Sequence, residues 1–457
     1  VNWNHYYNEN LSSTGVFAYS NYSAEKDEIE VESESSSLKT GVQYFSGKYN
    51  LRYTGFSSHS IDGGLQVIHY NVSRGEMSPY NDLSIIPSSK LEKEKAFENA
   101  VYLNDSWNIN EKISLNLGLR YSAYFTVGPK TQLQYLSNSY TEDAIIDTVF
   151  IGNNKIGKKY FGLEPRVAAK YQFNNQTSVK MSYNRNYQYI TMLSYTAISI
   201  PSDVWKLADD YIRPVQSDQY AIGFYRNNKE NTIETSVEFY YKNLSNVTEF
   251  KNNAVVEMNP YPEQELLNAK GQNYGIELML KKNKGKWDGW ISYTYSRSLR
   301  KAISTGSGNI NNGKEYPSAF DKPHDLSILA NYHINKRWRM SFNFFYSTGR
   351  PFTKPEKVAN IENGNKIVLY SDRNKYRIPD YHRLDFSISM DESLRKSKKW
   401  KGSWTFSVLN VYANHNTYSI FYKKEAPSAK NNYNQFSLYK LYILGIPLPT
   451  LTYNFIF

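Results

Sequence analysis

The chain has 457 residues, 40% of them hydrophobic and 21% charged. No stretch provides the ~20 consecutive apolar residues that a membrane-spanning helix needs, which excludes a helical membrane protein. Aromatic residues make up 16% of the chain and 42 residues are tyrosine, which argues against disorder and favours β structure. There is no cysteine, so disulfides, thiolate metal sites and thiol nucleophiles are excluded.

The net charge is formally +11, from 54 Lys and Arg against 43 Asp and Glu. A nucleic-acid-binding surface would gather these basic residues into one patch with interleaved aromatic residues. Here they are scattered along the chain, with one short cluster at 395–401. We therefore interpret the charge as a mildly basic, solvated surface and expect no nucleic-acid partner.

Apolar and polar residues alternate with a period of two through most of the chain. In 113–125 the odd positions are apolar and the even positions are mostly polar or small, and 233–241 and 325–332 repeat this alternation. A period of two is typical of a β-strand with one apolar and one polar face. This periodicity predicts an antiparallel, all-β protein.

We predict about seventeen strands, taken in chain order. Their approximate bounds are 2–8, 14–24, 36–57, 61–72, 95–107, 113–126, 159–173, 177–188, 216–226, 232–246, 268–282, 287–300, 320–333, 338–349, 380–391, 402–423 and 438–457. The third and the sixteenth are longer than a tilted bilayer crossing requires, so we expect them to extend beyond the bilayer.

The segments between the strands are short at one end and long at the other. Short polar turns are expected at 108–112, 174–176, 227–231, 283–286 and 335–337, where Asn and Gly tolerate positive φ. Long segments occupy 127–158, 191–214, 247–266, 301–318 and 352–379. This sorting is typical of a transmembrane antiparallel β-barrel in a bacterial outer membrane, with extracellular long loops and periplasmic short turns.

The odd number of strands carries an expectation of its own. If the short turns are periplasmic, the first and the last strand both run towards the periplasm. A closed single-chain bacterial barrel has an even number of strands. We therefore expect at least one further strand before Val1.

Aromatic residues are placed where the membrane interfaces are expected. Tryptophans at strand ends beside turns suit such a girdle: Trp107, Trp287, Trp338 and Trp404. Aromatic residues of a soluble β core are the alternative. At the C-terminus, Tyr453, Phe455 and Phe457 alternate with polar or aliphatic residues. They resemble the terminal-strand signal that the barrel-assembly machinery reads, and they place the C-terminus in the periplasm.

Several short segments, in this order and spacing, carry a family resemblance. They are Pro201–Trp205, Ile212–Pro214, Gln219–Gly223, Asn268–Gly271, Tyr274–Glu277, Phe320–Asp325, Tyr346–Phe352, Pro379–Asp385 and Leu409–Tyr412. With the strand pattern, they make residues 1–457 resemble the barrel of a TonB-dependent outer-membrane receptor or transporter, of the kind abundant in Bacteroidota. The resemblance implies a 22-stranded barrel of which about seventeen strands are visible, with the N-terminal plug and the TonB-binding box absent from this chain.

Motifs for covalent or metal chemistry are missing from the sequence. The seven histidines form no H-x-x-x-H or H-E-x-x-H spacing. There is no nucleophile elbow before a helix and no phosphate-binding loop. Asp321, His324 and Asp325 could bind a metal, but at the entry to a strand a structural hydrogen-bonding role is favoured. We predict no enzyme activity, no metal site and no cofactor.

Two groups of residues are candidates for functional contacts. Strand parity places the following charged side chains in the lumen, where they would bond to the plug and to neighbouring strands: Arg120, Glu234, Glu238, Glu277, Asp325, Arg339, Arg383 and Asp385. The resemblance implies that substrate binds near the outer mouth, on the long loops. Trp205, Tyr211, Arg350 and Arg373 are therefore the candidate substrate-binding residues.

The resemblance implies active import of a scarce nutrient, such as a siderophore, cobalamin, a glycan or a peptide. The protein would sit in outer-membrane lipid and work with TonB–ExbB–ExbD through the missing N-terminal part. The alternative is a structural or scaffolding barrel subunit of a larger outer-membrane complex. A surface lipoprotein partner is known for glycan importers, but these residues resemble the receptor branch that usually lacks one.

Overall fold

The computed structural model describes residues 1–29, 31–137, 140–194, 203–303, 310–360, 366–393, 400–424 and 436–456. Several predicted features lie outside these residues. They are Pro201 and Ser202 of the family resemblance, most of the basic cluster at 395–401, and Phe457 of the C-terminal signal.

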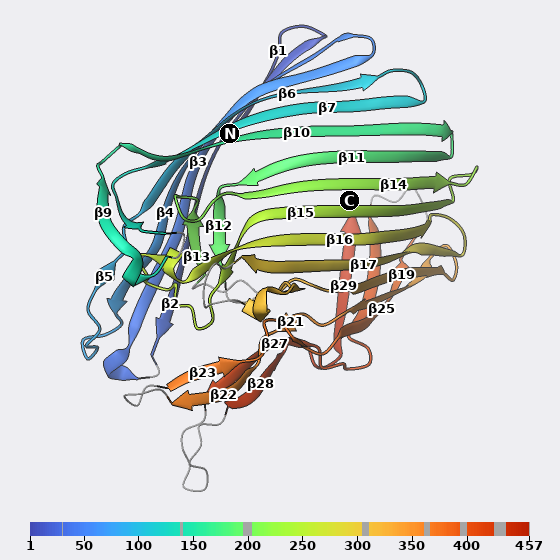
Figure 1. The fold of residues 1–457 in the computed structure, drawn as a ribbon. Helices are drawn as coiled ribbons and strands as arrows, with labels where there is room; N and C mark the ends of the chain where they lie inside the picture. Colours follow the sequence, from blue (N-terminus) through green and yellow to red (C-terminus); the bar gives the residue numbers. More distant parts are fainter. Residues whose placement is uncertain are drawn as a thin grey trace.

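One antiparallel sheet of nineteen strands forms the body of the molecule (Figure 1). Two of these strands, β5 (Ser89–Lys90) and β18 (Tyr316–Pro317), have only two residues. The other seventeen are β1 (Asn2–Tyr6), β2 (Leu11–Glu28), β3 (Ser36–Phe56), β4 (His59–Pro79), β6 (Glu94–Asn108), β7 (Ile113–Val127), β10 (Ile156–Asn174), β11 (Thr177–Gln188), β14 (Val215–Asn227), β15 (Ile233–Phe250), β16 (Leu266–Lys282), β17 (Trp287–Ile303), β19 (His324–His333), β20 (Trp338–Ser347), β25 (Tyr381–Asp391), β26 (Lys401–Leu409) and β29 (Leu448–Ile456).

The strand order is a meander, because each of the seventeen strands pairs with the next one along the chain, from β1–β2 to β26–β29. The sheet curls around a common interior (Figure 1). Within the described ranges, no pairing joins β1 to β29. The predictions of an all-β antiparallel fold and of seventeen strands are confirmed.

The last two predicted strands were wrong as continuous elements. Residues 402–423 divide into β26 and β27 (Thr417–Lys424), and 438–457 divides into β28 (Phe436–Tyr442) and β29. The chain turns because Asn410 and Ala413 take φ of 55° and 57° and Leu444 takes φ of 61°. The buried Asn410 amide donates to the Leu444 carbonyl at 2.8 Å, which joins the two breaks. The β27–β28 pair then forms a hairpin outside the main sheet.

The short turns are stabilised mainly by Asn side chains. Asn110 Oδ1 accepts hydrogen bonds at 2.9 Å from the backbone N–H groups of Lys112 and Ile113. Asn174 and Asn335 do the same in their own turns. The side chain thus replaces a turn bond that the backbone alone would lack. We expected positive φ in all five of these short turns. In the described residues it occurs in two of them, at Asn231 (51°) and Gly285 (116°).

The long segments fold into small hairpins of their own at the other end of the sheet (Figure 1). Besides β27–β28, they are β8 (Lys130–Tyr135) with β9 (Ile145–Ile151), β12 (Ile190–Leu193) with β13 (Val204–Leu207), β21 (Pro351–Phe352) with β24 (Tyr376–Arg377), and β22 (Pro355–Asn360) with β23 (Lys366–Tyr370). Short 3₁₀ turns, η1 (Glu32–Glu34), η2 (Glu142–Ala144), η3 (Pro262–Gln264) and η4 (Ile310–Gly313), are the helical elements of the described ranges. None of them has the length and apolar character needed to cross a membrane.

The two faces of the sheet differ in exposure. On β7, Leu119 and Tyr121 are 48% and 45% exposed, whereas Ser122 and Tyr124 on the other face are fully buried. Tyr124 belongs to a hydrophobic cluster in which Leu207 of β13 packs with residues of β4 and β6. The outer face is therefore apolar, as a lipid-facing wall requires, and the core lies inside, where β12–β13 folds against the sheet.

Candidate functional site

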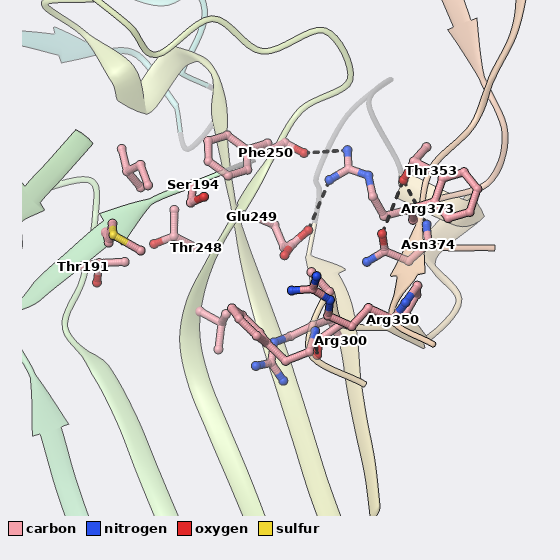
Figure 2. Close-up of a pocket in the computed structure, with 18 of the residues that line it drawn as sticks. Thr191, Ser194, Thr248, Glu249, Phe250, Arg300, Arg350, Thr353, Arg373 and Asn374 are labelled. Atoms are coloured by element: carbon pink, nitrogen blue, oxygen red, sulfur yellow. Dashed lines mark hydrogen bonds and ion pairs between the residues drawn. The ribbon is translucent and has the colours of Figure 1, made fainter. Parts of the chain in front are cut away.

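A cavity of about 1000 Å³ opens inside the curled sheet, at the end that carries the long loops. Its walls come from the loop ends of β11, β14, β15, β16 and β17, and from β12 and the segments around β21, β24 and β27. This volume is at the upper end of the ~300–1,000 Å³ range of ligand pockets. Figure 2 shows polar and charged side chains from these separate elements meeting around it.

The charges that line the cavity are mostly positive. The cations are Lys242, Lys251, Arg300, Arg350 and Arg373, and the one carboxylate in the described lining is Glu249. Low-dielectric walls concentrate the field of like charges in a cleft. The cavity therefore favours an anionic occupant.

Glu249 is already engaged by its neighbours. Arg373 Nη1 lies 3.3 Å from its Oε2, and the Tyr316 hydroxyl donates to the same oxygen at 2.9 Å. Arg373 also donates to the Phe250 carbonyl at 3.1 Å and to Asn252 Oδ1 at 3.0 Å. These bonds tie the segment before β24 to the end of β15 (Figure 2). The charge of Arg373 is thus largely compensated within the protein.

Arg300 and Arg350 are the cations that stand out. In the part of the chain that the structure describes, neither has a carboxylate oxygen within 4.0 Å. Arg300 Nη1 donates to Asn273 Oδ1 at 3.2 Å and to the Leu299 carbonyl at 2.9 Å. Arg350 Nη2 donates to the Tyr418 carbonyl at 2.7 Å, and burial lowers the pKa of Arg350. Glu249, which Arg373 already engages, is near enough to act electrostatically on Arg300 without forming an ion pair with it. A partly desolvated guanidinium that forms no ion pair is stabilised by an anion that enters the cavity.

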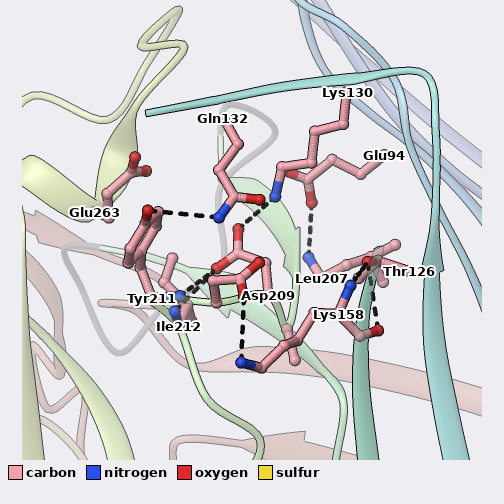
Figure 3. A network of polar contacts seen from close by, with 12 residues as sticks. Glu94, Thr126, Lys130, Gln132, Lys158, Leu207, Asp209, Tyr211, Ile212 and Glu263 are labelled. Carbon is pink, nitrogen blue, oxygen red and sulfur yellow. Dashed lines mark hydrogen bonds and ion pairs between the residues drawn. The ribbon is translucent and has the colours of Figure 1, made fainter. Parts of the chain in front are cut away.

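A second charged cluster lies next to the hydrophobic cluster and is largely buried (Figure 3). Lys206 Nζ, on a side chain that is 2% exposed, is 2.8 Å from Glu94 Oε1 and 2.6 Å from Asp209 Oδ2. Lys130 Nζ lies 2.9 Å from Asp209 Oδ2, and Arg74 Nε lies 2.9 Å from Glu94 Oε1. Despite burial, the nearby lysines hold the pKa of Asp209 well below its usual range.

This buried network joins segments that are far apart in the sequence. Asp209 Oδ1 accepts from the backbone N–H groups of Tyr211 and Ile212 at 3.0 and 2.9 Å, and Glu94 Oε2 accepts from Leu207 N at 2.9 Å. Since β12, the partner of β13, supplies part of the cavity wall, the network holds that wall in place.

The structure brings together two of the four predicted substrate-binding residues. Arg350 and Arg373 both line the cavity. Trp205 instead packs against the hydrophobic cluster. Tyr211 donates its hydroxyl to the Leu133 carbonyl and contacts the Tyr135 ring, at a separate smaller cavity. Sequence reasoning did not single out Arg300, because its position on β17 gives no sign of which loops close over it.

The predicted lumenal residues lie along the strands as follows. Arg120 is bonded to Glu98 at 3.0 Å and to Glu164 at 3.3 Å. Glu238 and Glu277 are register partners on β15 and β16. Nearer the short turns, Glu234 accepts from Asn283 at 2.5 Å, and Arg339 is the register partner of His333. At the far side, Arg383 pairs with Asp385 at 2.8 Å, while Asp325 is exposed beside a second cavity.

The aromatic C-terminal residues that are described lie on β29. The Phe455 ring stacks on Trp400 with centroids 4.7 Å apart, and the Tyr453 ring lies 4.6 Å from Trp404. Their proposed part in barrel assembly stays a prediction.

The Phe320–Asp325 motif has a structural place at the rim of the sheet. Asp321 is fully buried, accepts from Ser298 N at 2.7 Å and forms ion pairs with Arg297 and Arg377. The described residues contain no group of three potential metal ligands. Asp321 therefore closes the turn into β19, in the hydrogen-bonding role that was favoured for this motif.

Comparison with known proteins adds a family and a set of folds. A family model described as TonB dependent receptor-like, beta-barrel matches residues 1–412. The ferric yersiniabactin uptake receptor FyuA from Yersinia pestis superposes with a TM-score of 0.62 at 12% identity, over 99% of this chain and 60% of that one. No curated protein sequence matches significantly.

Two further solved structures share the fold. The ferric-catecholate import receptor Fiu from E. coli K12 has a TM-score of 0.59 at 12% identity, over 100% of this chain and 63% of that one. The copper transporter OprC has a TM-score of 0.59 at 11% identity, over 98% of this chain and 62% of that one. At these identities the similarity shows the fold alone. The chain spans about three-fifths of the length of each of these proteins.

Proposed function

Because this chain belongs to the TonB-dependent receptor β-barrel family, we propose that it is the barrel of an outer-membrane transporter that imports an anionic metal chelate of the siderophore type. The family consists of outer-membrane receptors rather than enzymes, in agreement with the prediction from the sequence. Its Bacteroidota branch stays a prediction.

The observation that carries the substrate class is a pair of arginines that form no ion pair with any carboxylate of the described residues. Arg300 and Arg350 line the 1000 Å³ cavity, and no carboxylate of the described ranges lies within 4.0 Å of either. A neutral glycan would leave both arginines without an ion pair. An anionic chelate would supply charge-assisted hydrogen bonds, worth about 1.5–3 kcal/mol each. The three similar proteins are named as receptors for ferric chelates and as a copper transporter, which supports a metal-related cargo.

The orientation follows from the same proposal. The long-loop end, which holds the cavity, faces the outside, and the short turns and the C-terminus face the periplasm. Outer-membrane lipid surrounds the apolar wall. The energy for uptake comes from TonB–ExbB–ExbD, as membership of the family implies.

The test is uptake of ⁵⁵Fe-labelled catecholate and hydroxamate siderophores by cells that produce the protein from its own gene. We expect uptake to require TonB, whereas binding in the cold persists without it. Arg300→Gln and Arg350→Gln should each weaken binding about tenfold, which corresponds to ~1.4 kcal/mol. Arg52→Gln, which removes an exposed ion pair with Asp62 outside the cavity lining, should leave binding unchanged.

Different outcomes would reject different parts of the proposal. Uptake that continues without TonB would reject the transport mechanism. Unchanged binding in both cavity variants would reject the anionic substrate class. Loss of the gene without any uptake defect, together with stable co-purification of another outer-membrane protein, would favour the scaffolding alternative.

A further inference from the structure

A second cavity, of about 520 Å³, lies next to the first on the wall formed by β19, β20 and β25. Three residues line both cavities: Arg350, Ile378 and Tyr418. The partition between the cavities therefore consists of Arg350, the segment before β25, and the start of β27. We call the larger space (about 1000 Å³) the outer cavity and the smaller space (about 520 Å³) the inner cavity; both lie at the long-loop end of their strands.

The backbone of the partition is held tightly. Gly349 packs so closely against the Ile378 carbonyl that an added Cβ would lie 1.7 Å from its oxygen. Gly349 N donates to Asp380 Oδ1 at 2.8 Å, and Ile378 N donates to the Arg350 carbonyl at 3.0 Å. Arg377 Nη1 donates to the Gly349 carbonyl at 2.9 Å. Position 350 is thus fixed between the two spaces.

The side chain of Arg350 is much less constrained than its backbone. A guanidinium has five N–H donors, and among the described residues this one makes a single hydrogen bond, to the Tyr418 carbonyl. The remaining donors are available to a ligand on either side of the partition. A bidentate acceptor such as a carboxylate, a catecholate or a hydroxamate matches this fork.

The inner cavity offers aromatic surface and little competing charge. Arg383 lies 5.5 Å from the centroid of the Phe345 ring, and its charge is compensated by Asp385 through bonds at 2.8 and 3.1 Å. Tyr381 adds a second ring to the lining. Lys322 and Asp325 also line this cavity and oppose one another in sign. Arg350 is therefore the partly buried cation of the inner cavity that lacks an ion-pair partner among the described residues.

We propose that the inner cavity is a second subsite for an anionic ligand and that Arg350 serves both subsites. A ligand that passes from Arg300 in the outer cavity to the inner cavity keeps its contact with the Arg350 guanidinium throughout, because Arg350 lines both spaces. The ligand class rests on the proposed function, but the existence of two anion-attracting spaces that share one arginine does not require transport.

The experiment measures the two cavities separately through introduced thiols. The 457 residues contain no cysteine, so one reporter can be placed in each space. Ser217→Cys lies in the lining of the outer cavity alone and Tyr381→Cys in that of the inner cavity alone. The purified protein in detergent is labelled with methanethiosulfonates that carry either a sulfonate or a trimethylammonium group. The ratio of the two labelling rates reports the local potential.

Arg350 and Arg300 provide a matched pair of variants, because Arg300 lines the outer cavity but not the inner one. We expect Arg350→Gln to lower the sulfonate-to-ammonium ratio roughly threefold or more at both reporters. Arg300→Gln should lower the ratio at Ser217→Cys and leave it unchanged at Tyr381→Cys. Thr348→Cys, which also lines only the inner cavity, replaces Tyr381→Cys if that variant does not fold.

One result would be that Arg350→Gln lowers the labelling ratio at the outer reporter and leaves the ratio at the inner reporter unchanged. That result would overturn the shared subsite and leave the proposed function standing. Equal responses of the inner reporter to Arg300→Gln and Arg350→Gln would overturn it too, because the two spaces would then be one. The expected labelling pattern combined with no siderophore uptake would support the subsites and reject the proposed function.

Discussion

Removal of Lys206 should release the segment that walls the outer cavity. The Lys206 side chain is 2% exposed, and its ammonium group contacts two buried carboxylates, Glu94 and Asp209, at 2.8 and 2.6 Å. In Lys206→Met both carboxylates stay buried and lose this partner. Deleting one member of a buried ion pair costs about 3–5 kcal/mol. Because Lys130 and Arg74 remain beside the carboxylates at 2.9 Å, we expect about 3 kcal/mol, at the lower end.

This cost should appear as local opening rather than loss of the barrel, since the network joins loops to strand ends. About 3 kcal/mol raises the open population roughly a hundredfold. Proteolysis of the folded protein in detergent follows that population when opening is fast relative to cleavage. The assay is therefore the rate of cleavage within 189–214, read by mass spectrometry.

Lys158→Met is the matched control, because Lys158 pairs at 3.2 Å with Asp210, the neighbour of Asp209 in the same loop. These side chains are 38% and 28% exposed, so the pair is worth at most about 1 kcal/mol. Equal cleavage rates for Lys206→Met and Lys158→Met would refute the reasoning, since burial would then have no bearing on the strength of the two pairs.

Three further perturbations test other parts of the structure. Burial raises the pKa of Glu263 in the loop between β15 and β16, so folding disfavours its charged form and the loop loses stability as pH rises above the unfolded pKa of about 4.3. Glu263→Gln should therefore slow proteolysis of 251–265 at pH 7.5, with a difference from the parent that narrows towards pH 4. Asp321→Ala leaves Arg297 and Arg377 without their ion-pair partner at the rim and should lower the free energy of unfolding by about 3–5 kcal/mol. On gels, a smaller fraction of the protein should then show the heat-dependent change in mobility of a folded barrel. Leu119→Arg puts a charge on the outward face of β7 and should cost up to about 2–4 kcal/mol in lipid vesicles, whereas an unchanged unfolding midpoint in urea would contradict a lipid-facing position.

The sequence alone determined the strands and their faces. Alternation is a local property, because successive side chains of a strand point to opposite sides whatever the strand packs against. It correctly assigned β7, where Leu119 faces outward and Tyr124 inward. The short turns were also readable, since Asn110 and Asn174 bond to backbone groups only two or three residues away.

The tertiary structure decided what could not be seen locally. The break at Asn410 depends on a hydrogen bond to Leu444, 34 residues away. The alternation of apolar and polar residues continues through this position, so the sequence did not predict the break. In the sequence, Lys206 lies in a long segment between predicted strands, with no sign of burial. Only the fold shows that it is buried beside Glu94 of β6. Arg300 and Arg350 became a candidate site only when distant loops met around them and brought no carboxylate within reach in the described ranges. Charge compensation depends on neighbours in space, and the order of residues along the chain does not specify those neighbours one by one.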